Sequence, residues 1–118
     1  MTKTEIKDQV LAMIRDKDQV SFAELTQAFP ETFKGGNFTL EAGKTNIVLW
    51  SGLTEEGFDI IVELRDENLI DFDPCDPLTY MIDGRALDLP LAKKATTYKH
   101  PHWCPIVLRP MAVAHATA

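Results

Sequence analysis

The stretch TEEGFDIIVELRDENLIDFDP, residues 54–74, changes its hydrophobic period part-way along, and this change limits the folds open to the chain. Up to Leu69 the apolar side chains recur at helical spacing, which predicts a helix over about residues 54–68. Thr54 is a good N-cap for that helix. From Ile70 the apolar residues alternate with aspartates, which predicts a strand. The chain is therefore expected to contain a helix that leads directly into a β-strand.

That strand is predicted to be the first arm of a β-hairpin. It is followed by the turn-forming sequence DPCDP. After this turn Leu78, Tyr80 and Ile82 occupy alternate positions, a period typical of a second strand. We therefore expect a hairpin over about residues 69–83, closed by Gly84.

Two capping boxes predict two further helices near the start of the chain. A Thr-x-x-Glu pattern begins at Thr2, ahead of apolar residues that fall on one helical face. A Ser-x-x-Glu pattern at Ser21 precedes a shorter helix over about residues 21–29. Val20, between these helices, is predicted to lie in a short strand, and residues 30–46 form a glycine-containing loop.

Helix, short strand, helix, loop, helix and β-hairpin is the order of elements in the winged-helix family, which residues 4–84 resemble. The segment VELRDENLIDFD is similar to the helix end that runs into the wing in that family. The resemblance implies an α+β fold, a winged helix of three helices plus a β-hairpin wing, over residues 1–88. Residues 89–118 would follow as an extended basic C-terminal segment, packed on this domain or partly disordered. In that family the third helix usually enters the major groove of DNA and the wing contacts the backbone or minor groove.

Charge is distributed unevenly along the chain, whose net charge is −6. Residues 54–88 hold two bases and eleven acids, while residues 89–118 hold four bases and no acid. Carboxylates form an acidic stripe on one face of the helix predicted over about residues 54–68. They would repel the phosphates of DNA, so this third helix is poorly suited to bind in the major groove. The stripe is either a solvated surface or a face for a basic protein partner or a second copy in a homodimer. Its candidate partner-binding residues are Glu56, Asp59, Glu63 and Asp66.

The basic C-terminal segment is the better candidate for binding DNA or RNA, because it interleaves cations with aromatic rings. Cations bind phosphate, and rings offer stacking surfaces for unpaired bases. The alternative is that Trp103 and Tyr98 pack the segment onto the core while the lysines stay solvated. The candidate nucleic-acid-binding residues are Lys34, Lys44, Lys93, Lys94, Tyr98, Lys99, His102 and Arg109.

Two histidines and a cysteine, His100, His102 and Cys104, occupy alternate positions that would project to one side of an extended strand. With Cys75 or an aspartate they could bind zinc. The spacing is not that of a zinc finger, however, and the neighbouring prolines oppose a regular strand. We therefore expect no bound metal and no cofactor.

The sequence predicts a binding protein and not an enzyme. It contains no Walker loop, dinucleotide fingerprint or Gly-x-Ser-x-Gly motif. Its longest aliphatic or aromatic run, residues 47–50, is far shorter than the about 20 residues that cross a bilayer, so we expect no membrane partner. With no apolar signal core at the start, the predicted location is cytoplasmic and both thiols are predicted to be free. We expect a regulator-like nucleic-acid-binding protein, or alternatively a protein-interaction module that binds no nucleic acid.

Overall fold

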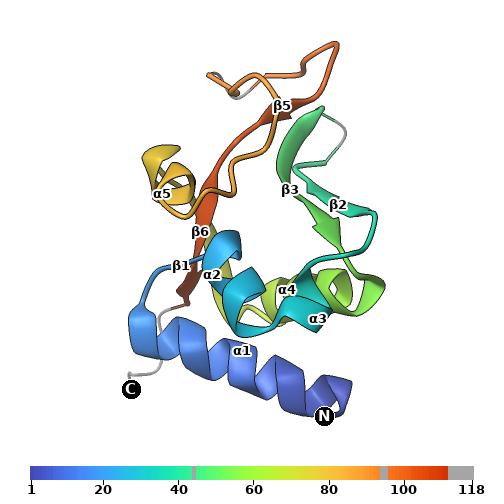
Figure 1. Ribbon diagram of the computed structural model, residues 1–118, viewed down its shortest axis with the longest axis vertical. Helices are drawn as coiled ribbons and strands as arrows, with labels where there is room; N and C mark the ends of the chain where they lie inside the picture. The colour runs from blue at the N-terminus through green and yellow to red at the C-terminus, as the bar shows by residue number, and fades with distance from the viewer. Residues whose placement is uncertain (44, 94–95, 112–118) are drawn as a thin grey trace.

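The fold is α+β, as predicted, and consists of helices packed around two small sheets (Figure 1). The computed structural model describes residues 1–43, 45–93 and 96–111, which contain five helices and two three-stranded sheets. The elements in chain order are α1 (Lys3–Lys17), β1 (Val20–Ser21), α2 (Phe22–Ala28), α3 (Pro30–Phe33), β2 (Phe38–Glu41), β3 (Ile47–Leu53), α4 (Glu55–Asp66), β4 (Ile70–Pro74), α5 (Leu78–Met81), β5 (His102–Trp103) and β6 (Ile106–Pro110).

The three longer helices begin where their caps predicted. The N–H of Glu5 donates to the side chain of Thr2, and Glu5 accepts in return from the N–H of Thr2. Ser21 forms the same reciprocal box with the residue three positions on, and Thr54 caps α4. These side chains satisfy backbone donors that a helix start leaves unpaired. The predicted helices α1, α2 and α4 are thereby confirmed.

The last strand, β6, is the middle strand of the first sheet, whose order is β1-β6-β4. It pairs antiparallel with both neighbours, so that Leu108 lies opposite Val20 on one side and Phe72 on the other. Leu108 is fully buried. Figure 1 shows β6 running through the molecule between β1 and β4, and it also contacts α1. The C-terminal segment thus contributes the strand around which this sheet is built.

The hairpin predicted over residues 69–83 is wrong in its second half. Residues 78–81 form the short helix α5, and the strand that pairs with β4 is β6. The alternation from Leu78 onward is too short to separate a strand from one helical turn. Asp76 favours the helix, because its carboxylate accepts from the N–H of Leu78 at 2.9 Å. Pro77 begins the turn with a backbone angle already suited to it.

The second sheet, of order β2-β3-β5, was not predicted as such. β2 and β3 form an antiparallel pair with two register irregularities, and they occupy part of the predicted loop and the apolar run after it. β5 adds to β3 in parallel, with Val48 opposite Trp103. The segment that carries β5 is therefore tied to the β2–β3 hairpin that precedes α4.

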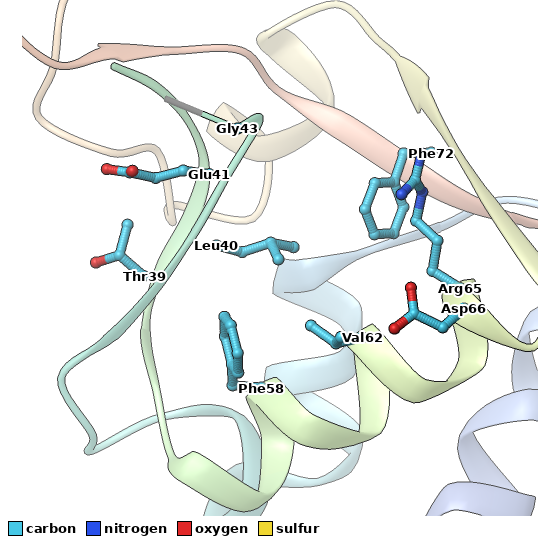
Figure 2. Close-up of a pocket in the computed structure, with 9 residues that line it drawn as sticks. All are labelled: Thr39, Leu40, Glu41, Gly43, Phe58, Val62, Arg65, Asp66 and Phe72. Atoms are coloured by element: carbon cyan, nitrogen blue, oxygen red, sulfur yellow. The ribbon is translucent and has the colours of Figure 1, made fainter. Parts of the chain in front are cut away.

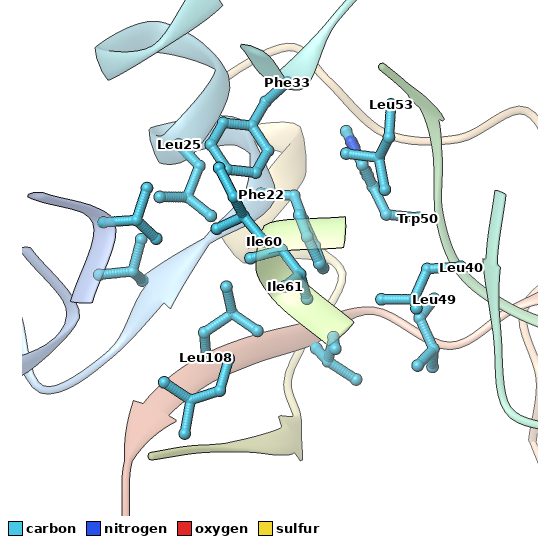
Figure 3. Packing of buried hydrophobic residues seen from close by; sticks show 14 of the residues in the cluster. Phe22, Leu25, Phe33, Leu40, Leu49, Trp50, Leu53, Ile60, Ile61 and Leu108 are labelled. Atoms are coloured by element: carbon cyan, nitrogen blue, oxygen red, sulfur yellow. The ribbon is translucent and has the colours of Figure 1, made fainter. Parts of the chain in front are cut away.

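One hydrophobic core joins the two sheets. Figure 3 shows side chains of α2, α4, β3 and β6 converging on it. Within it Trp50 stacks on Phe22 with ring centroids 5.8 Å apart, and it also contacts Tyr80 at 5.0 Å. Trp103 packs edge-on against Tyr80 at 5.3 Å. This aromatic cluster links α2, β3, α5 and β5.

Tyr80 fastens α5 to the core through its hydroxyl group. The hydroxyl accepts from the N–H of Phe22 at 3.0 Å and donates to the carbonyl oxygen of Ile106. Both partners are backbone groups in the buried interior, where an unpaired polar group is costly. Leu78, on the same short helix, and Ile82, which follows it as the C-cap residue, are exposed.

Replacing Gly57 by alanine should destabilise the fold, because α4 passes very close to α3 at this residue. A Cβ atom there would lie 2.3 Å from the carbonyl oxygen of Thr32. We expect Gly57→Ala to lower the free energy of unfolding by about 1–3 kcal/mol in urea titrations. In an open helix the same change would stabilise, so an unchanged or raised value would contradict this contact between α3 and α4.

Candidate functional site

The structure brings together three described members of the predicted nucleic-acid-binding set. Lys93, Tyr98 and His102 line one open pocket of about 680 Å³, together with Pro90 and Leu91. His102 belongs to β5, which lies at the opposite end of the molecule from α1 (Figure 1). The exposed Lys99 follows Tyr98 directly in the chain. We call Lys93, Tyr98, Lys99 and His102 the Tyr98 cluster.

Tyr98 is held in place by contacts on several sides. Its ring stacks on that of His102 with centroids 3.8 Å apart and planes inclined by 22°. Its hydroxyl accepts from the N–H of Lys93 at 3.0 Å. Its own N–H donates to the carbonyl oxygen of Thr45 at 2.9 Å, and its carbonyl accepts from the side chain of Asn46 at 2.7 Å. The segment around Tyr98, which precedes β5, is thereby attached to the turn between β2 and β3.

The remaining members of the predicted set lie elsewhere. Arg109 donates to the carboxylate of Asp73 at 3.1 Å and lies 3.4 Å from that of Asp18, and these contacts raise its pKa. It therefore links β4, β6 and the end of α1. Lys34 is exposed at the end of α3. Lys44 and Lys94 lie outside the described residues.

The predicted packing of Trp103 onto the core is confirmed. Its side chain is 1% exposed, and it contacts Trp50 as well as Tyr80. Trp103 is therefore not available to stack on a base. The residue before it, His102, is half-buried and lines the pocket.

The acidic stripe of α4 is partly engaged by α1. Lys3 and Lys7 both bond to the carboxylate of Glu63, the latter at 3.1 Å, and Lys7 also reaches Glu67 at 2.9 Å. The hydrogen bond from Lys3, followed by that from Lys7, lowers the pKa of Glu63. Of the predicted partner-binding residues, Glu63 thus holds two helices together. Its hydrogen bond is the main cause that raises the pKa of Lys3, and the charge of Asp59 adds to this shift.

Another side of α4 forms one wall of a groove that the sequence did not predict. We call it the α4 groove; its volume is about 360 Å³ and it lies between β2, α4 and β4 (Figure 2). Asp66, of the predicted stripe, is one of its lining residues, whereas Glu56 is exposed away from it. The groove is lined by Thr39, Leu40, Glu41, Gly43, Phe58, Val62, Arg65, Asp66 and Phe72.

The structure does not bring His100, His102, Cys104 and Cys75, the candidate zinc ligands, together as a metal site. In the described ranges no group of three or more histidine, cysteine, aspartate or glutamate side chains is placed to hold a metal ion. The Nδ1 atom of His102 lies 2.8 Å from the carbonyl oxygen of His100. Cys75 and Cys104 are free thiols, and burial raises the pKa of each.

Comparisons with known proteins give no family to which the chain can be assigned. No protein-family model, no curated protein and no solved structure matches it. Among the described helices, none has both the length and the apolar character that a bilayer-spanning segment requires.

Proposed function

We propose that the chain is an elaborated winged helix. α1, β1, α2, α4, β4 and β6 follow the order helix, strand, helix, helix, strand, strand. The antiparallel neighbours β4 and β6 would be the two strands of the wing. The segment from α3 to β3 is then an insertion before the third helix, and residues 75–105 are an insertion within the wing.

We further propose that the protein binds nucleic acid through the Tyr98 cluster, and prefers unpaired strands. The observation that carries this proposal is the stacked pair of Tyr98 and His102, which shares a pocket with Lys93. An aromatic platform beside a cation can stack a base and hold its phosphate, and stacking tolerates any base sequence. The described residues from 89 to 111 include no acid that would repel the backbone.

α4 corresponds to the third helix of a winged helix. It is poorly suited to bind in the major groove for two reasons. The β2–β3 hairpin stands beside α4, so Leu40 and Phe58 line a common groove (Figure 2). The major groove is about 12 Å wide and admits a helix, but not a helix flanked by a second hairpin. The carboxylates of Glu56 and Asp66 would also approach phosphates. A regulator-like role is proposed by analogy with what winged helices commonly do.

Binding should be tested by fluorescence anisotropy with labelled single-stranded DNA, single-stranded RNA and duplex DNA. Tyr98→Ala should weaken binding to single strands about five- to 100-fold, which is the loss expected for one stacked base. Tyr98→Phe keeps the ring and should bind nearly as well as the wild type. Failure of the wild type to bind any of these probes at micromolar concentration in low salt would rule the proposal out.

The salt dependence gives a separate measure of phosphate contacts. Replacing Lys93 and Lys99 together by alanine should reduce the slope of log affinity against log salt by about 1.4 for single strands. The control is a double variant with Lys34→Ala and Arg109→Ala, which makes the same change in charge away from the Tyr98 cluster. It should leave the slope of log affinity against log salt nearly unchanged. An equal effect of both pairs would show that only net charge matters.

A further inference from the structure

The α4 groove has an apolar floor that continues onto the surface. Leu40 from β2, Phe58 and Val62 from α4, and Phe72 from β4 point into it (Figure 2). The ring of Phe38 lies 5.6 Å from that of Phe58, and Phe38 is 37% exposed. A volume of about 360 Å³ is at the small end of the range for ligand sites, so it suits one bulky side chain better than a folded surface.

The α4 wall of this groove carries a negative charge, the carboxylate of Asp66 (Figure 2). Glu41 also lines the groove, but its side chain leaves β2 on the side opposite to Leu40 (Figure 2). Neither carboxylate forms an ion pair with any residue that the structure describes. Among the described lining residues the cation is Arg65, which lies over the ring of Phe72 at 4.9 Å from its centroid and is engaged there. A partner with positive charges beside an apolar side chain would therefore complement this groove.

The strand edges beside the groove are not suited to adding another strand. The carboxylate of Asp71 accepts from the N–H of Phe72 at 2.9 Å, so this donor on β4 is already used. Pro74, at the end of β4, has no N–H to offer. β2 is short and irregular in register. These features blunt an edge, so the partner is expected to dock through side chains and not through β-augmentation.

We propose that the α4 groove binds a cationic segment of a partner protein. One large apolar side chain inserts between β2 and β4, and a lysine or arginine residue of the same segment lies beside Asp66. Nucleic acid is disfavoured here because it would bring phosphates to carboxylates. This surface is separate from the Tyr98 cluster, and the proposal does not depend on nucleic-acid binding.

The probes are three labelled synthetic peptides of about ten residues that differ in one feature each. The first has a central leucine flanked by lysines and arginines, the second has alanine at the centre, and the third replaces the basic residues by glutamates. Anisotropy should show salt-sensitive binding of the first peptide. The alanine peptide should bind about tenfold or more weakly, and the glutamate peptide should not bind.

Variants of the protein locate the site. Asp66→Asn should weaken binding of the leucine peptide about three- to tenfold, whereas Asp16→Asn, the same change on the exposed surface of α1, should not. Val62→Arg fills the groove with a cation and should abolish binding, and circular dichroism checks that this variant is folded.

Three results would overturn the proposal. One is no binding of the leucine peptide in low salt. Another is equal binding of the leucine and alanine peptides, or equal effects of Asp66→Asn and Asp16→Asn, because attraction would then be non-specific. The last is a dimer in sedimentation that Val62→Arg dissociates while no peptide binds, because a second copy would then occupy the groove.

Discussion

Replacing Trp103 by alanine should lower the free energy of unfolding by about 3–5 kcal/mol, which is the cost of truncating a large core side chain. Trp103 is almost completely buried, and its ring contacts those of Trp50 and Tyr80. The cavity left by alanine would lie where β5 meets β3 and α5, a junction whose strands cannot close on it without losing their pairing. Urea titration monitored by circular dichroism measures the change.

Trp103→Phe provides the matched control. The indole Nε1–H of Trp103 is buried and has no hydrogen-bond partner among the residues that the structure describes. Phenylalanine therefore removes volume but no hydrogen bond, and should cost clearly less than alanine. A loss below about 1 kcal/mol for the alanine variant would contradict the docking of this segment, since surface substitutions typically fall in that range.

Tyr80→Phe should lower the free energy of unfolding by about 2–4 kcal/mol, although it removes a single oxygen atom. That oxygen bonds to the N–H of Phe22 and to the carbonyl oxygen of Ile106, and both groups would be left unpaired in the interior. The expected loss lies in the lower part of the range for two unsatisfied backbone groups, each of which costs about 1–3 kcal/mol. The measurement is again equilibrium unfolding in urea.

The same variant should change the response of stability to alkaline pH. Burial raises the pKa of Tyr80 above its ordinary value of 10.0. The folded protein thus keeps a proton that the unfolded chain releases, and the stabilisation present below pH 10 is lost as the pH rises toward the higher folded pKa. Between about pH 9 and about pH 11 the wild type should lose more stability than Tyr80→Phe. Parallel losses would show that Tyr80 is not buried as described.

The helices were predictable because their signals are local. The capping boxes at Thr2 and Ser21 and the N-cap at Thr54 each use atoms within three residues of one another, and the structure forms all three. The apolar face of α4 was also predicted from spacing, and Ile60, Ile61 and Leu64 are buried. Short-range hydrogen bonds and helical periodicity do not depend on the rest of the fold.

Strand pairing was much less predictable, because it depends on residues far apart in the chain. Nothing near Phe72 indicates that its partner is Leu108. The five-residue alternation that starts at Leu78 fits a strand and a helical turn equally well. Asp76 followed by Pro77 was a helix-start signal that could have decided between them.

The two candidate sites also differ in how far the sequence could predict them. The Tyr98 cluster was partly predictable because its aromatic and basic residues are neighbours in sequence. The α4 groove was not, because Leu40, Val62 and Phe72 come together only through tertiary packing. Likewise, the pairing of Lys7 with Glu63 depends on how α1 crosses α4.

The central place of β6 has a consequence for biosynthesis. Among the described strands, β1 and β4 each pair only with β6, and the contact between Val20 and Leu108 spans most of the chain. On the ribosome this sheet cannot assemble until residues 106–110 have left the exit tunnel. Contacts of such long range slow folding, because a large loop must be ordered before they form. Until β6 has emerged, the apolar faces of α1, α2 and α4 therefore remain open to chaperones.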